Sequence, residues 1–210
     1  MVMGKILAIG AHFDDVEIGC GGALLRHRAH GDKIRIIVLT HSGYTEGNIF
    51  FRSPEDCLKE GVESAKILGA ELVCLNLETL NLSFENRLIA ILFEEISKYQ
   101  PDRVYCHFDG DLHSDHMSAG SASVMASRSV PQVLLYRSNF GTPIKPWQPT
   151  FFLDISGCLR AKLKLLEVFQ SEKRKIGAWR RNALANAYIN GSLAGVQWAE
   201  GFVVQRFLEN

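Results

Sequence analysis

The sequence lacks an excess of either charge. Lysine plus arginine and aspartate plus glutamate both number 23 in its 210 residues. A nucleic-acid or anionic-membrane surface needs a basic excess, so the composition argues against both kinds of partner. The one basic run, residues 172–181, is better explained as a solvated helix face than as a nucleic-acid patch. We therefore expect no nucleic-acid partner.

Cysteine pairs with redox or zinc-binding spacing are also missing. The five cysteines form no CxxC pair, and several lie in apolar runs. We interpret them as buried hydrophobic residues in a reducing compartment rather than as a disulfide framework. No apolar run has the length of a transmembrane helix, and the N-terminal apolar stretch is too short for a signal peptide. We expect a cytoplasmic protein with no membrane span.

Short β-branched runs alternate along the chain with longer helical patterns, without repeats or a dividing linker. The patterns predict strands at 5–11, 33–41, 71–77, 102–108, 132–138 and 151–155, and a final edge strand within 196–207. They predict helices at 17–30, 53–69, 84–100, 115–129 and 157–171. Residues 139–150 hold three prolines and predict a loop, and no clear element follows residue 176 before the final strand. This order predicts one α/β domain over 1–210, a doubly wound, mostly parallel sheet with helices on both faces.

Ionisable side chains gather where two of the predicted strands end. His12, Asp14 and Asp15 follow the first strand, and the fourth strand leads into DGDLHSDH, which contains His113 and His116. The carboxyl ends of parallel strands meet at one edge of the sheet, where ligands of such folds bind. We therefore expect the two groups to share one site.

The spacing of these residues suggests a metal centre. His12 and Asp15 are three positions apart across a strand-to-helix corner, so both can point at one ion, and His116 supplies a third ligand. Two histidines and a carboxylate with an open fourth position are typical of catalytic zinc. Such chemistry also needs a base and a donor that stabilises an oxyanion or protonates the leaving group, and Asp14 and His113 are the groups left for these tasks. Each motif alone would more often represent helix capping and turn chemistry, and it is their coincidence at one edge that favours the metal.

Two motifs resemble those of a known family. AHFDDVEIGCGG (11–22) resembles the AHPDDxExGxGG signature of the PIG-L (LmbE-like) N-acetylglucosamine deacetylases, and HSDH (113–116) resembles their HPDH motif. AEGF (199–202) is similar to the family's C-terminal AExF. The resemblance implies a Rossmann-like, metal-dependent hydrolase that removes acetyl groups from amino sugars or their conjugates. Zinc is the expected metal, although other divalent ions such as Fe²⁺ suit such ligands.

The resemblance also implies roles for individual residues. His12, Asp15 and His116 match the metal ligands of the family. Asp14 matches the general base, and His113 matches the histidine that stabilises the tetrahedral intermediate. Asp115 matches a carboxylate that would orient a histidine of its own loop. The family further suggests a homo-oligomer.

The sequence departs from the family pattern at two positions. Phe13 replaces the motif's proline, and we expect it to loosen the corner or to line the pocket mouth. Cys57 stands where the family's RxxE motif has an arginine that reaches toward substrate. A thiol cannot supply a charged, forked donor, so Arg52 or Lys59 would have to compensate.

Further candidates for substrate binding are less specific. His41 could contact a sugar hydroxyl or cap its strand, and Arg137 could bind substrate or form a surface salt bridge. Trp147 could stack on a sugar ring or pack in the core. With Arg52, these residues form the predicted binding set. Two other functions stay open: hydrolysis of a non-sugar amide, and a catalytically silent metal- or sugar-binding protein. The intact Asp14 argues against the silent protein, because binding alone needs no base.

Overall fold

The structure is a computed structural model that describes residues 3–46 and 49–209. Its main sheet has seven strands in the order β5-β2-β1-β6-β7-β9-β8. These strands are β1 (Lys5–Gly10), β2 (Lys33–Thr40), β5 (Ala70–Leu77), β6 (Arg103–His107), β7 (Gln132–Tyr136), β8 (Phe151–Asp154) and β9 (Ala199–Phe207). A separate antiparallel hairpin pairs β3 (Tyr44–Glu46) with β4 (Ile49–Arg52).

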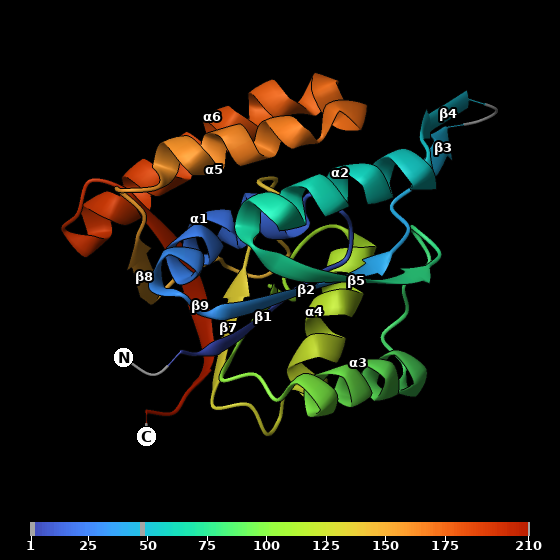
Figure 1. The fold of residues 1–210 in the computed structure, drawn as a ribbon, viewed down its shortest axis with the longest axis horizontal. Helices are drawn as coiled ribbons and strands as arrows, with labels where there is room; N and C mark the ends of the chain where they lie inside the picture. The colour runs from blue at the N-terminus through green and yellow to red at the C-terminus, as the bar shows by residue number, and fades with distance from the viewer. Residues whose placement is uncertain (1–2, 47–48, 210) are drawn as a thin grey trace.

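Helices cover both faces of the sheet, as the alternating pattern predicts (Figure 1). On one face lie α1 (Asp15–His30), α2 (Pro54–Leu68), α5 (Leu159–Leu165) and α6 (Lys173–Ala194). On the other lie α3 (Asn86–Tyr99) and α4 (Ser114–Ala126). Two short 3₁₀ turns, η1 (Leu166–Val168) and η2 (Gln170–Glu172), join α5 to α6.

Side chains of β1 alternate between two cores. Leu7 and Ile9 pack with residues of α3 and α4, whereas Ile6 and Ala8 pack with residues of α1 and α2. Every one of these β1 side chains is buried. A strand covered on both faces reads as a continuous apolar run, which explains the KILAIG segment.

Local sequence signals account for several helix ends. The side chain of Ser53 accepts the backbone N–H of Asp56, and Pro54 opens α2. Gly31 and Gly69 follow α1 and α2 with φ of 83° and 63°, a left-handed conformation that glycine adopts without strain. These features confirm the predicted start of α2 and the predicted glycine stops of α1 and α2, whereas α1 begins two residues earlier than expected, at Asp15.

Three features differ from the sequence-based expectations. The final strand, β9, is not at the edge: it lies between β7 and β8 and runs antiparallel to both, which leaves β8 at the edge. The expected helix over 157–171 ends early, at Leu165, and continues as 3₁₀ turns. The stretch after residue 176, without a clear pattern, lies in α6. Polar and small side chains obscure the periodicity of this surface helix, because packing on one side is enough to hold it.

A contact between distant parts of the chain stabilises α1 at a point where its helical geometry is interrupted. The backbone of Cys20, with φ −138° and ψ 16°, interrupts the helix. The Glu200 carboxylate from β9 accepts the N–H groups of Gly22 and Ala23 at 2.8 and 2.7 Å. Lys162 of α5 forms a buried ion pair with Glu200 at 2.5 Å. The AEGF segment thus anchors the second half of α1 to the sheet.

The strand order also fixes where a ligand can bind. From β1 the chain builds outward through β2 and β5 on one side and through β6 and β7 on the other. The loops after β1 and β6 therefore diverge, and such a switch point is where ligands bind in α/β sheets. Among the described residues, no helix combines the length and apolar character that a bilayer span requires.

Candidate metal centre and active-site cavity

A sharp corner joins β1 to α1 and gives Asp14 an unusual backbone. Asp14 has φ 113° and ψ −28°, which residues other than glycine seldom adopt and which costs roughly 1–3 kcal/mol. The corner lets His12 and Asp15 approach each other, while the Asp14 carboxylate turns to Arg52. That carboxylate makes no capping hydrogen bond to α1, which removes the capping interpretation for Asp14.

His12, Asp15 and His116 bring one donor atom each to a common point. These three atoms all lie within 4.8 Å of one another. Asp15 Oδ2 is 3.2 Å from His12 Nδ1, and Asp15 Oδ1 is 3.1 Å from His116 Nε2. His12 follows β1 and His116 lies in the first turn of α4, so the group spans the switch point. The predicted ligand trio is thus assembled by the fold.

The electrostatics of this trio favour positive charge. Burial opposes a charge on His12, but hydrogen bonds with Asp115 and Asp15 outweigh it and raise the pKa of His12 to about 9. Burial also opposes a charge on His116, yet Asp15 beside it raises the pKa of His116 to about 10. The carboxylates that raise these pKa values would also attract a divalent cation, which would bind the neutral histidines and displace their protons. Donor chemistry and charge both fit a metal ion.

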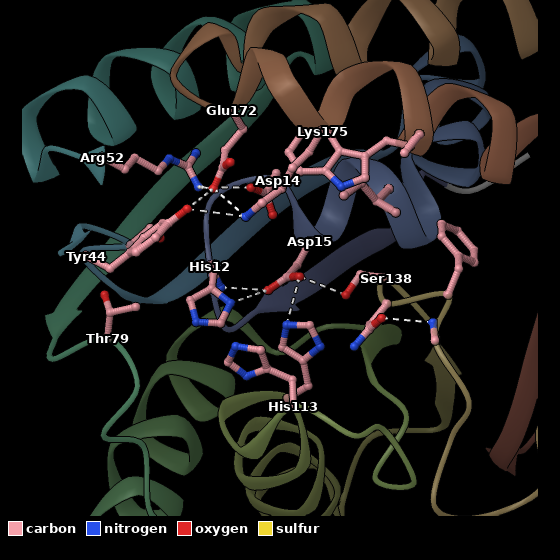
Figure 2. A pocket seen from close by; sticks show the side chains of 18 of the residues that line it. His12, Asp14, Asp15, Tyr44, Arg52, Thr79, His113, Ser138, Glu172 and Lys175 are labelled. Atoms are coloured by element: carbon pink, nitrogen blue, oxygen red, sulfur yellow. Dashed lines mark hydrogen bonds and ion pairs between the residues drawn. The ribbon is translucent and has the colours of Figure 1, made fainter. Parts of the chain in front are cut away.

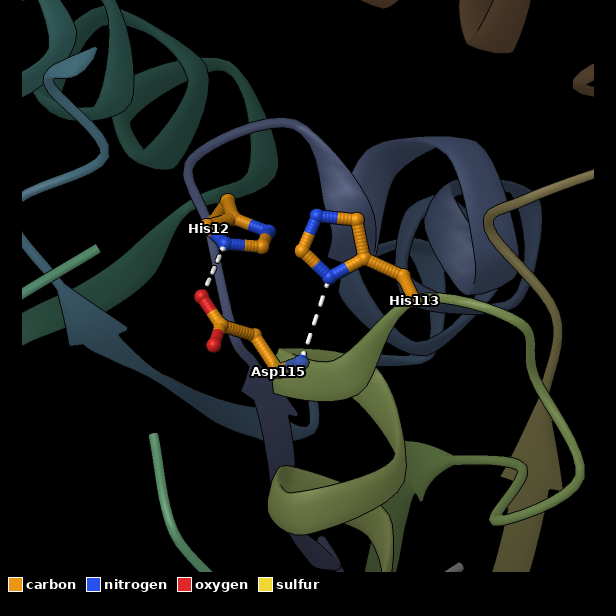
Figure 3. A group of neighbouring side chains, drawn as sticks. All are labelled: His12, His113 and Asp115. Carbon is orange, nitrogen blue, oxygen red and sulfur yellow. Dashed lines mark hydrogen bonds and ion pairs between the residues drawn. The ribbon is translucent and has the colours of Figure 1, made fainter. Parts of the chain in front are cut away.

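A second trio, His12, His113 and Asp115, lies beside the first (Figure 3). The fully buried Asp115 holds His12 Nε2 at 2.9 Å and accepts the N–H groups of Leu80 and Leu82 at 2.7 and 3.1 Å. His113 Nδ1 accepts the Asp115 N–H at 3.2 Å and caps α4. With these contacts, the Asp115 carboxylate can fix the orientation of His12. The sequence predicted that Asp115 would orient a histidine of its own loop; its carboxylate instead contacts His12, and only its backbone N–H reaches His113.

Asp14 forms an ion pair with Arg52. The buried Arg52 donates from one terminal nitrogen to Asp14 Oδ2 at 2.9 Å and from the other to the Phe13 carbonyl at 3.1 Å. Its Nε donates to Ser171 Oγ at 2.9 Å, and Glu60 lies 3.5 Å away. Burial raises the pKa of Asp14 to about 6, although Arg52 acts in the opposite direction. Asp14 is therefore a buried carboxylate with a pKa close to neutrality, as general bases often have.

The trio and Asp14 open into a cavity of about 790 Å³. Figure 2 shows Glu172 and Lys175 on one side of it and His12 and His113 on the other. Of the residues predicted from the sequence, the cavity is lined by His12, Asp14, Asp15, Arg52, His113 and His116. Asp115 lies behind this lining, fully buried.

The other predicted substrate-binding residues lie outside this lining. His41 Nδ1 accepts the Gly43 N–H at 3.1 Å, and His41 Nε2 is 3.4 Å from Glu78. Arg137 donates to backbone carbonyls of its own loop, and its guanidinium lies 5.6 Å from the centre of the Trp147 ring. Arg137 and Trp147 border a separate space of about 30 Å³, large enough for a water molecule only.

Three polar residues of the site escaped the sequence reasoning. Ser138, after β7, donates to Asp15 Oδ1 at 2.7 Å. Asp111 Oδ2 lies 3.2 Å from His116 Nδ1, where it can fix the orientation of that ring. His107 ends β6 and accepts the Ala11 N–H at 3.0 Å beneath the trio. The acid-rich DGDLHSDH segment hinted at Asp111, but nothing in the sequence singled out Ser138.

Phe13 neither loosens the corner nor lines the cavity mouth. Its ring is buried in the core between α1 and α2, where it packs over Gly61. A Cβ added at Gly61 would overlap the ring, so α2 needs glycine there. Cys57 is buried beside Arg52, and burial raises the pKa of its thiol to about 12. Lys59 is exposed and pairs with Asp56 at 3.8 Å, so of the two candidates for the family's arginine, Arg52 is the one that lies at the site.

Residues 7–127 match the PIG-L family, which is described as GlcNAc-PI de-N-acetylase. The chain belongs to this family. Over 148 residues it is 37% identical to the uncharacterized deacetylase YaiS of Escherichia coli, covering 63% of this chain and 73% of that protein. It is 25% identical to the diacetylchitobiose deacetylase of Thermococcus kodakarensis, with 94% of this chain and 81% of that one aligned.

A solved member of the family has the same fold. The N,N'-diacetylchitobiose deacetylase of Pyrococcus horikoshii superposes with a TM-score of 0.83 at 23% identity. The superposition covers 96% of this chain and 84% of that one. At this identity the likeness establishes the α/β fold alone. The PIG-L resemblance and the mostly parallel sheet expected from the sequence are both confirmed.

Proposed function

We propose that this member of the PIG-L family is a zinc-dependent deacetylase that hydrolyses the N-acetyl group of an amino sugar or sugar conjugate. The observation that carries the proposal is that the two aspartates at the β1–α1 corner lie in different places. His12 and Asp15 converge with His116, while Asp14 lies apart on Arg52. The names of the relatives, which are deacetylases of N-acetylated sugars, support the reaction and the substrate class.

The ligands in this proposal are His12, Asp15 and His116, with Asp115, Asp111 and Ser138 fixing their orientation. When bound, zinc supplies Lewis acidity and lowers the pKa of water toward neutrality. The same nitrogen and oxygen donors accept other divalent ions, Fe²⁺ among them.

Asp14 is the proposed general base. Its pKa of about 6 leaves it ionised at neutral pH, so it can accept a proton from the attacking water. The water oxygen then forms a bond to the acetyl carbonyl carbon. As the C–N bond breaks, the proton passes from Asp14 to the leaving nitrogen, which yields a free amine and acetate. Arg52 positions Asp14, and because its donors are engaged by protein groups we assign it no direct contact with substrate.

His113 is the proposed oxyanion stabiliser. Burial lowers its pKa, as do the neighbouring histidines, so the ring is neutral at physiological pH. Because Nδ1 accepts the Asp115 N–H, the ring proton lies on Nε2. That N–H is a fixed donor at the cavity wall for the negative charge that develops on the carbonyl oxygen.

The test combines metal analysis with one substitution. Purified protein should bind about one zinc per chain. Asp14→Asn should keep the metal and lose acetate release from N-acetylglucosamine and N,N'-diacetylchitobiose by roughly 10²–10⁴-fold, the usual contribution of a general base. Asp56→Asn, an exposed aspartate on α2, is the matched control. Full activity of Asp14→Asn, or a protein that takes up no metal at neutral pH, would refute the mechanism.

The same assay separates the alternatives. N-acetylated amino acids in the panel test the non-sugar amidohydrolase, which would cleave them faster than the sugars. A silent binding protein would retain metal and sugar but release no acetate from any compound. A cytoplasmic location and a homo-oligomeric assembly remain predictions from the sequence.

A further inference from the structure

Helix α1 is interrupted shortly after the β1–α1 corner. Cys20 has φ −138° and ψ 16°, about 75° and about 58° away from the values of a regular α-helix. Residues 15–19, the first turn of α1, therefore stand between the corner and this break. The first turn carries the proposed metal ligand Asp15, so its direction decides where that carboxylate lies.

A buried ion pair takes the place of the hydrogen bond that a regular helix would form across the break. In such a helix the N–H of Gly22 donates to the carbonyl of Ile18. Here the Gly22 N–H donates to Glu200 Oε1 at 2.8 Å. The Ile18 carbonyl accepts from Lys162 Nζ, also at 2.8 Å. Lys162 Nζ and Glu200 Oε1 are 2.5 Å apart, so the pair joins the two sides of the break.

Both members of this ion pair are shielded from solvent. Lys162 is 4% exposed and Glu200 is 5% exposed. A Cβ added at Gly22 would lie 2.8 Å from Glu200 Oε1, so glycine at this position lets the carboxylate reach the backbone. Burying two charges is costly, and apolar side chains of similar volume often give equal or greater stability. The stability of the fold alone therefore gives no reason for an ion pair here.

The first turn of α1 is fixed by two contacts near the break. Gly19 packs so closely on the Tyr136 ring that an added Cβ would overlap it. Lys162 holds the Ile18 carbonyl, one residue earlier. Asp15 extends from the same turn, and its position relative to the ligand histidines therefore depends on the angle at the break.

We propose that Lys162 and Glu200 are positioning residues for the metal centre. Their ion pair keeps the first turn of α1 at the angle at which Asp15 meets the ligand histidines. Without the pair, the helix can close its own hydrogen bonds across the break, which straightens α1 and turns Asp15 away from His116. The inference rests on the proposed function, because it takes the metal ligands from there.

The zinc affinity of folded variants tests this role. Lys162→Met/Glu200→Leu replaces both charges by apolar groups of similar volume, so the protein should keep its stability in chemical denaturation. Its affinity for Zn²⁺, measured by competition with a chelator, should fall about 10–100-fold, the usual effect of losing a residue that orients metal ligands. The visible spectrum of bound Co²⁺ should change as well, because it reports the ligand geometry. Glu200→Gln, which keeps the size of the side chain and removes its charge, should weaken zinc binding about tenfold even if the double variant does not fold.

Asp32→Asn is the matched control at the far end of α1. Asp32 Oδ2 lies 2.6 Å from His27 Nδ1, and Asp32 Oδ1 accepts the Gly4 N–H at 2.9 Å. The substitution weakens the attachment of the same helix without contact with its first turn, so the zinc affinity should stay at the wild-type value. Wild-type zinc affinity and an unchanged Co²⁺ spectrum in the variants of Lys162 and Glu200 would overturn the inference and leave the proposed deacetylase intact.

Crystal structures of the metal-free proteins keep the two proposals separate. In the wild type, Asp15 Oδ1 lies 3.1 Å from His116 Nε2. In the double variant this distance should increase, and the N–H of Gly22 should donate to Ile18. An Asp15 carboxylate that stays in place overturns the inference. If the wild-type protein binds no zinc, the proposed function fails, and the displacement of Asp15 alone supports or overturns the positioning role.

Discussion

Replacing Arg52 by glutamine tests whether this residue keeps Asp14 ionised. Arg52 is the only cation that contacts Asp14 among the described residues, at 2.9 Å, and it is 4% exposed. Burial raises the pKa of Asp14 to about 6 even with Arg52 present. Without the guanidinium, the burial effect acts unopposed.

The size of the effect follows from the pairing. An arginine beside a carboxylate lowers its pKa by roughly 1–3 units, so its loss should move the Asp14 pKa up by about 2. At pH 7 the ionised fraction would then fall from about nine-tenths to about one-tenth. Removing one partner of a buried ion pair also destabilises the fold by about 3–5 kcal/mol.

The assay is the pH dependence of kcat/KM for acetate release between pH 5 and 10. Its acidic limb should move upward by about 2 units in Arg52→Gln and return most of the way in Arg52→Lys, which restores the charge. Lys59→Gln is the control, because Lys59 is exposed and pairs with Asp56. A uniform loss of activity at every pH, with the limb in place, would refute the electrostatic role and leave Arg52 a structural residue.

Two further predictions concern the packing around the corner. Gly61→Ala should destabilise the protein by about 1–3 kcal/mol in chemical denaturation, because its Cβ meets the Phe13 ring, whereas Gly157→Ala, with open space around it, should change little. Equal stability of the two variants would contradict the packing described for Phe13. Burial raises the pKa of Glu17 from 4.5 to about 7, so the folded state binds this proton more tightly than the unfolded state. Glu17 should therefore contribute a fall in the stability of the metal-free protein of up to about 3 kcal/mol as pH rises through that interval, and Glu17→Gln should make the slope shallower, most clearly above pH 6, where Asp14 contributes less. An unchanged slope in Glu17→Gln would assign the slope to other groups.

The sequence contained enough information for the mostly parallel sheet and for the grouping of His12, Asp15 and His116. Apolar runs and glycine caps are local signals, and the parallel direction of the strands follows from βαβ connections. His12, Asp15 and His116 could be grouped because each lies at the end of a strand or the start of the next helix. Where residues follow strands, topology alone brings them together.

Partners that meet only through tertiary packing could not be predicted in this way. Arg52 ends a short hairpin strand, and its contact with Asp14 depends on how that hairpin folds over the site. Ser138 follows a strand without any sequence feature that distinguishes it, and its hydrogen bond to Asp15 depends on tertiary packing. The sequence of α6 has no clear hydrophobic periodicity. The loop residues His41 and Trp147 make their contacts outside the cavity, with Glu78 and Phe108 respectively.

The hydrogen bonds from Gly22 and Ala23 of α1 to Glu200 of β9 cannot form until both segments have been synthesised. Gly22 and Ala23 are made early, yet the carboxylate that accepts their N–H groups is 178 and 177 residues further along the chain. Each such buried N–H left without a partner costs about 1–3 kcal/mol. A nascent chain that has completed all of its parallel strands still lacks this acceptor. The second half of α1 therefore gains these hydrogen bonds only after the β9 segment has been synthesised.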